Sequence, residues 1–357
     1  MNLNALFLKS FRVLLLPFAL LYGLVIIIRN FLYDKGYLKS ARFNFPLVCV
    51  GNLAVGGTGK SPMVEYLVNL LHKEFRVGTL SRGYKRKTKG YVLAGDRTTA
   101  LEIGDEPMQF HLKFPDAAVA VGEERLDAVP QLLHDRPELE AIILDDAFQH
   151  RAVIAGLNIL LTEFSNLFSD DIFLPTGDLR DQRGSYKRAD IIVVTKCPAE
   201  LTIEMKRKTI REIQPYPHQQ VFFTTIEYGL PYHIASKATR QITQADEILL
   251  VCGIANPQPL KQYIFDQAQT YYQMDYSDHH IFSIDDLREI KRRFARMDAP
   301  SGFIITTEKD AMRFLKFRQE IGDLPLYVLP IRHRFLFAEG RKFDELVISF
   351  IRNFKNR

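Results

Sequence analysis

Residues 47–71 read LVCVGNLAVGGTGKSPMVEYLVNLL. The apolar, β-branched run at residues 47–50 predicts a buried strand, and the spacing of apolar residues over 63–71 predicts a helix. Between them, residues 54–61 have the spacing of a phosphate-binding loop, or P-loop, except that Ala54 stands where the first glycine is usual. A strand, this loop and a helix in that order predict an α/β domain that binds a nucleotide.

The loop predicts a specific chemistry. Its expected nucleotide-binding residues are Ala54, Val55, Gly56, Gly57, Thr58, Gly59, Lys60 and Ser61. Small residues allow backbone N–H groups to surround phosphate oxygens, and the N-terminus of the following helix attracts the same anion. In this arrangement Lys60 contacts the β- and γ-phosphates, and the Ser61 hydroxyl is a ligand of Mg²⁺.

A P-loop also needs a carboxylate for the metal at the end of a neighbouring strand. Residues 141–144 predict that strand, and Asp145 and Asp146 follow it directly. One of the two carboxylates is expected to bind Mg²⁺, directly or through water, and the other to orient it. Gln149 and His150 come just beyond the strand, where open α/β sheets bind ligands, so both are candidate substrate contacts.

The identity of the nucleotide follows from a motif that is missing. Guanine is usually read by Asn-Lys-x-Asp after a strand, and the nearest candidate, residues 195–198, reads TKCP and lacks both the Asn and the Asp. ATP is therefore the expected nucleotide. A kinase, a membrane-associated NTPase that acts as a switch or targeting factor, and an interaction module with a degenerate P-loop are the three classes to distinguish. Intact Lys60, Ser61 and Asp145 argue against the degenerate module.

The first part of the chain carries an apolar segment and all of the excess charge. Residues 13–28 contain no charged residue and are flanked by Lys9 and Arg12 before and by further basic residues after. A helix of 16 residues covers about 24 Å, less than a bilayer core of about 30 Å. A buried core helix is one interpretation. A helix embedded in or lying on a membrane is the preferred one, because basic flanks suit an anionic cytoplasmic leaflet.

The formal net charge of +5 comes from this region, since residues 1–50 hold six of the 47 basic residues and one of the 42 acidic ones. The rest of the chain is neutral overall, so nucleic-acid binding is not expected. A hydrophobic content of 47% with 25% charged residues excludes a disordered chain. Cys49, Cys197 and Cys252 are far apart and end apolar runs, which predicts buried, free thiols in a reducing compartment.

Two sets of strands alternate with helices along the rest of the chain. The first set is predicted at 47–50, 77–80, 117–121, 141–144, 157–161 and 191–194, and the second at 248–252, 271–274, 303–306 and 326–329. Ser283 with Asp286 predicts a capped helix start in the second set. The expected fold class is α/β, a P-loop NTPase-type parallel sheet with helices on both faces and a second, smaller α/β domain. We expect an N-terminal helix over 1–36, a P-loop domain over 37–222 and the smaller domain over 223–357.

Other motifs occur in a fixed order beyond the loop. They are Ser81-Arg82-Gly83-Tyr84, Gly104-Asp105-Glu106-Pro107, Asp145-Asp146 with Gln149-His150, Leu174-Pro175 with Gly177, Leu179 and Arg180, Asp278-His279, and Thr307-Glu308-Lys309-Asp310-Ala311. With the N-terminal apolar segment and Gly51-Asn52-Leu53 before the loop, this set resembles the tetraacyldisaccharide 4'-kinase family of lipid A biosynthesis. The resemblance covers nearly the whole chain.

The resemblance implies transfer of the γ-phosphate of ATP to the 4'-hydroxyl of a tetraacylated glucosamine disaccharide 1-phosphate. It implies that Asp105 and His279 form the dyad that activates this hydroxyl, with Lys60 at the transferred phosphate, and that domain closure completes the site. It also implies a lipid partner and a position at the cytoplasmic face of the bacterial inner membrane. Arg82 lies in a basic stretch, residues 76–89, that is either a site for the substrate's 1-phosphate or for anionic lipid headgroups, or an ordinary solvated loop. Arg180 is a further candidate substrate contact.

The sequence departs from the family pattern at two places. Asp181 follows Arg180 where the family commonly has Glu, so the side chain is one methylene shorter. Ala147-Phe148 stand where Gly-Leu is frequent after the acidic pair. The sequence predicts neither acyl-chain preference nor oligomeric state.

Overall fold

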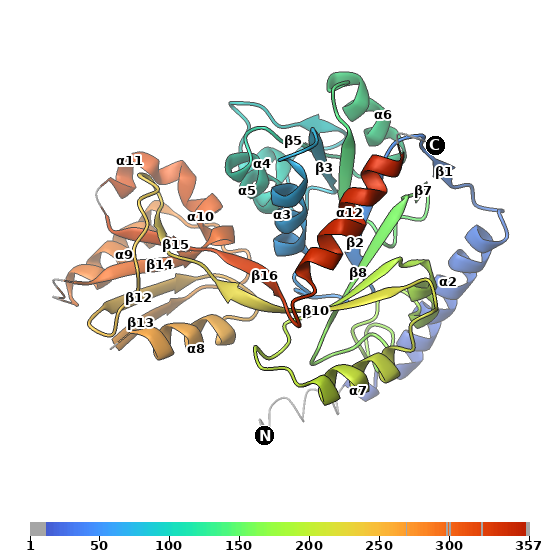
Figure 1. Ribbon diagram of the computed structural model, residues 1–357. Coiled ribbons are helices and arrows are strands. Elements are labelled where there is room, and N and C mark those ends of the chain that lie inside the picture. The colour runs from blue at the N-terminus through green and yellow to red at the C-terminus, as the bar shows by residue number, and fades with distance from the viewer. Residues whose placement is uncertain (1–11, 269, 298, 300, 323, 355–357) are drawn as a thin grey trace.

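The protein folds into two α/β units and a long N-terminal helix, as the computed structural model in Figure 1 shows. The structure describes residues 12–268, 270–297, 299, 301–322 and 324–354. Lys9, predicted to flank the apolar segment, lies outside these residues. The predicted fold class is confirmed, because both units are built on sheets that are mostly parallel and have helices on both faces.

The larger unit is built on a sheet of nine strands in the order β16-β10-β9-β8-β2-β6-β3-β5-β4. The strands are β2 (Leu47–Asn52), β3 (Val77–Ser81), β4 (Val92–Leu93), β5 (Ala118–Val121), β6 (Ala141–Asp145), β8 (Leu157–Glu163), β9 (Ile191–Thr195), β10 (Gln220–Tyr228) and β16 (Ile331–Phe335). All neighbours pair in parallel except β4 and β16, which are antiparallel at the two edges. A small parallel ladder joins β1 (Ala41–Arg42) to β7 (Val153–Ile154).

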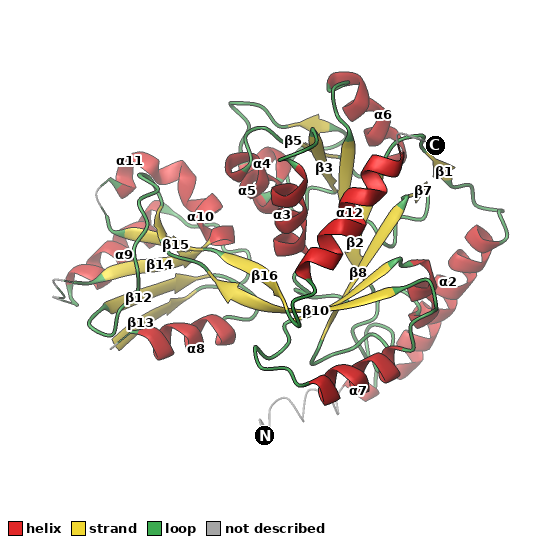
Figure 2. Cartoon of the chain, in the orientation of Figure 1, coloured by secondary structure: helices red, strands yellow, loops and turns green. Residues whose placement is uncertain are grey.

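Helices cover both faces of this sheet, which explains the continuous apolar runs of its strands. On β2, Val48 and Val50 face one core, and Leu47 and Cys49 face the other. The helices over the first core are α3 (Lys60–Leu71), α5 (Asp105–Lys113) and α12 (Gly340–Phe354), and those over the second are α6 (Arg125–Asp135) and α7 (Ile203–Ile213). Figure 2 shows α12 lying near α3. All six predicted strands of the first set are present.

The smaller unit has a five-stranded sheet in the order β11-β15-β14-β12-β13. Its elements are β11 (Tyr232–His233), β12 (Glu247–Cys252), α8 (Gln258–Gln267), β13 (Thr270–Asp275), α9 (Ile284–Ala295), β14 (Phe303–Thr307), α10 (Glu308–Phe314), η2 (Leu315–Phe317), α11 (Arg318–Ile321) and β15 (Leu326–Leu329). The capping box that Ser283 and Asp286 predict at the start of α9 is confirmed. Cys49, Cys197 and Cys252 are buried and free, as predicted, although Cys197 follows β9 rather than lying in it.

The predicted division at residue 222 does not match the sheets. The chain enters the smaller unit after β10, at residues 229–231, and returns at Pro330 between β15 and β16. Strand β16 then pairs with β10, and α12 packs on the larger sheet. The end of the chain therefore belongs to the larger unit. Strand patterns in the sequence do not indicate which sheet a strand joins. The prediction of a single domain boundary at residue 222 is therefore wrong.

Helix α2 (Leu16–Asp34) lies along the edge of the larger unit (Figure 1). Its outward face is apolar and exposed, with Leu14 just before the helix 70% exposed and Phe18 and Leu21 more than 60%. Its inward face holds Ala19, Gly23 and Asn30. By length and composition the helix is able to cross a membrane. The core-helix interpretation is wrong for the described part, because most of its apolar side chains are exposed.

The position of α12 gives a test of the corrected boundary. Phe343 is fully buried and its ring contacts Tyr66, Phe222 and Phe335 of the larger unit. We expect Phe343→Ala to lower the free energy of unfolding by about 3–5 kcal/mol, because it leaves a cavity in this core. Urea unfolding measures the loss, with the exposed Arg341→Ala as the control. A loss below about 1 kcal/mol in Phe343→Ala contradicts the assignment of α12 to this core.

Candidate active site

The P-loop leads from β2 into α3, as the sequence predicts. Gly56 and Gly59 have φ angles of +104° and +83°, a left-handed conformation that glycine adopts without steric cost. Helix α3 begins at Lys60, so its N-terminus faces the loop. Thr58 is buried, and its Oγ1 has no partner among the described residues. The backbone of the loop is therefore shaped to bind phosphate.

Ala54 fits where the first glycine of the motif is usual. It forms an antiparallel bridge with Leu179, and the N–H of Val55 donates to the carbonyl of Asp178 at 2.8 Å. The φ angle of Ala54 is not positive, so a Cβ causes no strain there. Asp178 and Leu179 thus fix the backbone at the start of the loop, where the usual motif has a glycine.

Two side chains from other strands hold the end of the loop. Thr195, at the end of β9, donates its hydroxyl to the carbonyl of Thr58 at 2.9 Å. His333 on β16 has its Nε2 2.9 Å from the carbonyl oxygen of Gly59 and its Nδ1 3.0 Å from the Thr224 hydroxyl. A carbonyl only accepts, so Nε2 carries the proton and Nδ1 accepts from Thr224. The strand that returns from the smaller unit therefore contacts the P-loop directly.

Asp145 ends β6 beside β2, where its register partner is Val50. It is 4% exposed, and its Oδ1 has no partner among the described residues. Burial, with the nearby Glu106 and Asp146 carboxylates, raises the pKa of Asp145 to about 7 despite Lys60 and Arg125. A buried carboxylate oxygen without a protein partner suits a metal ion, whose charge would stabilise the ionised form.

Asp146 has a different environment. Its φ of +49° turns it away from the strand, and it accepts two hydrogen bonds from Arg180, one of them from Nη1 at 3.0 Å. Lys60 Nζ lies 3.7 Å from Asp146 Oδ1. Burial opposes ionisation, but the Arg180 hydrogen bonds and Lys60 outweigh it and lower the pKa of Asp146. In this structure Asp146 orients two cations and Asp145 is free for a metal.

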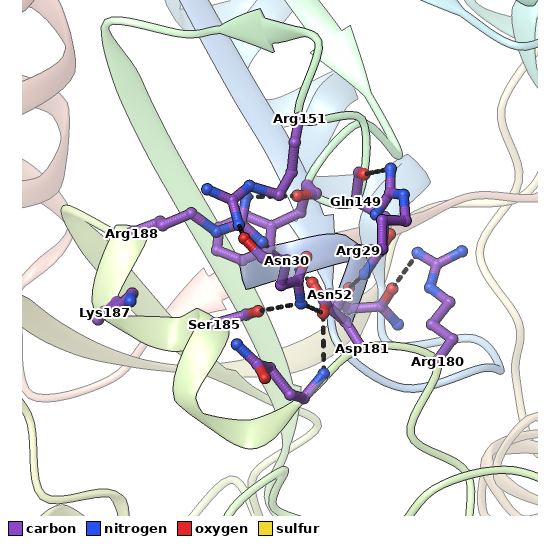
Figure 3. A network of polar contacts seen from close by, with 12 residues as sticks. Arg29, Asn30, Asn52, Gln149, Arg151, Arg180, Asp181, Ser185, Lys187 and Arg188 are labelled. Carbon is purple, nitrogen blue, oxygen red and sulfur yellow. Dashed lines mark hydrogen bonds and ion pairs between the residues drawn. The ribbon is translucent and has the colours of Figure 1, made fainter. Parts of the chain in front are cut away.

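Asn52, at the end of β2, connects these cations, and the sequence did not predict its role. Its Oδ1 accepts from Arg180 Nη2 at 2.5 Å and from Lys60 Nζ at 3.3 Å. Its backbone carbonyl accepts from the Gln149 side chain. Figure 3 shows Asn52, Gln149 and Arg180 close together. The available signals were the position of Asn52 just after a predicted strand and its place in the Gly51-Asn52-Leu53 motif.

The candidate substrate residues are placed differently from one another. The side chains of Gln149 and Arg180 donate hydrogen bonds to Asn52, so both are engaged within the protein in this structure. His150 is half-buried with its Nε2 unpartnered among the described residues, and burial, then Arg125, lowers its pKa. Arg82 is exposed. In the same basic stretch, Arg86 is buried and paired with Glu123 at 2.6 Å, which leaves it unavailable to a ligand.

Asp105 and His279 come together from the two units. Asp105 begins α5, and its Oδ2 lies 3.7 Å from Nδ1 of His279, which is in the loop after β13. Arg313 of α10 joins them, with Nε and Nη2 both 2.8 Å from Asp105 Oδ2 and Nη2 3.2 Å from His279 Nδ1. The sequence analysis did not predict Arg313. Its one sequence signal was its position one helical turn after Asp310. The buried Asp310 carboxylate also accepts a hydrogen bond from Arg313 at 2.8 Å.

His279 is held in its neutral form. Burial, followed by the nearby charge of Lys309, lowers the pKa of His279, and Asp278 only partly opposes this. Lys309 Nζ lies 3.1 Å from Nε2, while Arg313 approaches Nδ1. A neutral imidazole accepts at one nitrogen only, so one of these two contacts is a hydrogen bond in any tautomer. An imidazole that is unprotonated near neutral pH is able to accept a proton.

A second polar cluster also joins the two units. Lys113 of α5 pairs with Glu65 of α3 at 2.5 Å and with Glu308 of α10 at 2.7 Å, and both carboxylates are nearly buried. Burial and the facing Glu308 raise the pKa of Glu65 to about 7. Apolar contact between α5 and α10, including Met108 and Ala311, surrounds the cluster. The two units are therefore in contact beside the Asp105–His279 pair.

The fold and the site define a P-loop enzyme that binds a nucleotide and has a carboxylate and an imidazole close together at the junction of two α/β units. Residues 11–352 match the family described as tetraacyldisaccharide-1-P 4'-kinase. The chain belongs to this family, which confirms the resemblance found in the sequence.

Curated relatives and a solved structure agree. The chain is 44% identical to the tetraacyldisaccharide 4'-kinase of Flavobacterium johnsoniae, over 96% of this chain and 97% of the relative. It is 40% identical to that of Bacteroides thetaiotaomicron, over 95% and 93% of the two chains. The crystal structure of LpxK from Aquifex aeolicus in complex with ATP aligns with a TM-score of 0.74 at 28% identity, covering 96% of this chain and 99% of that one.

The contact between His333 and the P-loop predicts a pH dependence of stability. Burial lowers the pKa of His333 from 6.5 to about 4. Between these values the unfolded chain binds a proton that the native chain excludes, so stability falls as the pH falls from about 6.5 toward 4. We expect His333 to account for a loss of about 2 kcal/mol between pH 7.5 and pH 5.

Urea unfolding of the wild type and of His333→Gln at the two pH values measures this contribution. Glutamine keeps a donor for the Gly59 carbonyl but does not titrate, so its stability should change by about 2 kcal/mol less than that of the wild type. Equal changes in the two proteins would show that His333 is not held neutral in the native state.

Proposed function

We propose that this protein transfers the γ-phosphate of ATP to the 4'-hydroxyl of a tetraacylated glucosamine disaccharide 1-phosphate, a step of lipid A biosynthesis. The names of its relatives supply the reaction, and the P-loop with Asp145 supplies the nucleotide site. The observation that carries the proposal is the Asp105–His279 pair, because a hydrolytic switch needs no base for an alcohol acceptor.

Nucleotide and metal have a consistent set of candidate ligands. Thr58 Oγ1 and Asp145 Oδ1 are buried polar atoms without protein partners among the described residues, which suits a site built for Mg²⁺ and phosphate. Ser61 and Asp145 would hold the metal, and Asp146 would orient Lys60 and Arg180 beside it. Bound Mg²⁺ supplies charge stabilisation on the transferred phosphoryl group.

Different residues of the chain would carry out the separate parts of phosphoryl transfer. The acceptor oxygen attacks the γ-phosphorus as its proton passes to the Asp105–His279 pair, and the bond to the β–γ bridging oxygen breaks. Lys60 and the backbone N–H groups of the loop stabilise negative charge on the phosphate oxygens. Arg313 holds Asp105 toward His279 across the two units, so the base is complete only when they are in contact. Arg82 remains a candidate contact for the substrate's 1-phosphate.

Transfer of label from γ-labelled ATP to a tetraacyl disaccharide 1-phosphate in mixed micelles tests the reaction. Lys60→Ala and Asp145→Ala should abolish detectable transfer. Asp105→Ala and His279→Ala should each lower kcat by about 10²–10⁴-fold with the KM for ATP little changed, because they remove proton transfer and not nucleotide binding. The exposed His134→Ala on α6 is the matched control and should keep wild-type kcat.

Two results would count against this function. Label that appears only as free phosphate at every acceptor concentration favours the NTPase switch. Near-normal turnover by both Asp105→Ala and His279→Ala removes the proposed base.

We also infer that α2 attaches the protein to the cytoplasmic face of the inner membrane. Its exposed stripe of Leu14, Phe18, Leu21, Val25 and Ile28 follows the helical period and is entirely apolar. Acyl chains of the substrate lie in the bilayer, and extraction costs about 0.8 kcal/mol per CH₂. An enzyme whose site lies at the interface avoids that cost.

Replacing Phe18, Leu21 and Val25 together by serine tests the attachment. These side chains are exposed, so the fold should be kept while sedimentation with vesicles containing anionic lipid is lost. The control replaces Leu112, Leu126 and Phe265, which are exposed on α5, α6 and α8, and should sediment as the wild type does. Equal sedimentation of both triple variants contradicts the assignment.

A further inference from the structure

The inward face of α2 carries a buried polar side chain, Asn30, where a simple anchor would be apolar. Asn30 is 0% exposed, and its Nδ2 donates to Asp181 Oδ1 at 2.7 Å. Asp181 is 1% exposed and also accepts from Arg188 Nη2 at 3.0 Å and from the N–H of Gln182 at 2.8 Å. Figure 3 shows Asn30 directed at Asp181, with Ser185 beside them. A buried amide and carboxylate bonded to each other fix the position of the helix.

This bond leads directly to the phosphate site. Asp181 follows Arg180, whose carbonyl accepts from the Tyr22 hydroxyl of α2 at 3.0 Å and whose N–H donates to the carbonyl of Leu53 at 2.8 Å. The Arg180 guanidinium bonds Asp146 and Asn52. Helix α2 therefore contacts the backbone of Arg180 through Tyr22 and the adjacent Asp181 through Asn30.

A second connection from α2 reaches the same place. Arg29 Nη2 donates to the carbonyl of Gln149 at 3.0 Å, and the Gln149 side chain donates to the carbonyl of Asn52. Asn52 Oδ1 accepts from Lys60 of the P-loop at 3.3 Å. Two separate chains of hydrogen bonds from one turn of α2 thus converge on Asn52.

Close packing makes the placement of α2 precise. A Cβ at Gly23 would lie 2.5 Å from the ring of Phe173, so only glycine allows the helix to approach this closely. Phe173 pairs with Leu179, in the segment that also bridges Ala54 at the start of the P-loop. A shift of α2 would therefore move the residues around Arg180.

We propose that Asn30 is a positioning residue for phosphoryl transfer: its bond to Asp181 sets Arg180, and through it Asp146 and Lys60, so that the membrane-facing helix is a structural part of the phosphate site. The proposal rests on the kinase function above. It accounts for Asp181, because Asn30 reaches this shorter carboxylate from the helix. The inward face of α2 serves the site while its outward face is left for lipid.

The test compares full-length Asn30→Ala with the wild type in three measurements: sedimentation with vesicles containing anionic lipid, kcat at saturating ATP and acceptor, and the KM for the acceptor. We expect unchanged sedimentation, a kcat at least tenfold lower, and a KM for the acceptor within threefold of the wild type. The exposed Asn353→Ala on α12 is the matched control and should change none of these.

A swapped pair distinguishes positioning from general destabilisation. Asn30→Asp alone places two carboxylates in contact and should lower kcat further than Asn30→Ala. Asn30→Asp combined with Asp181→Asn restores a hydrogen bond between the two positions, but the N–H of Gln182 loses its carboxylate acceptor. We therefore expect kcat of the double variant to recover in part, to at least threefold above that of Asn30→Asp. Thermal unfolding midpoints confirm that each variant is folded at the assay temperature.

A kcat of Asn30→Ala within twofold of the wild type overturns the proposal, as does a loss that the swapped pair fails to recover. Failure of the wild type to sediment with vesicles would remove the membrane assignment and leave this inference standing. Failure of the wild type to phosphorylate the acceptor would remove the proposed function instead, so the three outcomes are distinguishable.

Discussion

The carboxamide of Asn52 is the contact on which the geometry of the phosphate site depends. It is fully buried at the end of β2, and its Oδ1 accepts hydrogen bonds from Arg180 and Lys60. Two cations near one neutral acceptor repel each other unless a carboxylate balances them, and Asp146 does so. Asp145, the last residue of β6, is then left without a cation in contact with its side chain among the described residues, and burial raises its pKa. The two neighbouring aspartates therefore have different environments, with Asp146 bonded to Arg180 and the Oδ1 of Asp145 unpartnered among the described residues.

The same region shows what the sequence predicts and what it does not. The sequence predicts the P-loop, the acidic pair and the central strands of both sheets, because each depends on local pattern, apolar runs and residue spacing. It does not predict β4, β10, β11 and β16. Three of the contacts at the site join residues more than 100 positions apart: Arg180 with Asn52, Arg313 with Asp105, and His333 with Gly59. No local pattern records such contacts. The domain boundary failed for the same reason, because the pairing of β16 with β10 is decided by tertiary packing and not by strand pattern.

Strand β16 connects the smaller unit to the P-loop. The chain crosses between units at residues 229–231 and at Pro330, and β10 and β16 pair beside both crossings. His333 lies two residues into β16 beyond its start and contacts the carbonyl of Gly59. A rotation of the smaller unit about these crossings acts first on β10 and β16. The P-loop is therefore in direct contact with a strand that continues one of the two connections, and the Asp105–His279 pair lies where the two units meet.

Two solvents impose opposite demands on α2. In the proposed attachment the acceptor lies in the bilayer and ATP in water, so phosphoryl transfer would require the phosphate site at a fixed depth beneath the membrane surface. An apolar outer face gives affinity for lipid but no orientation, because lipid contact is not directional. Hydrogen bonds are directional, and those from Tyr22, Arg29 and Asn30 fix the helix relative to Arg180 and Asn52. In the proposed attachment, the hydrogen bonds of the inner face would therefore set a defined distance between the acyl chains and the transferred phosphate.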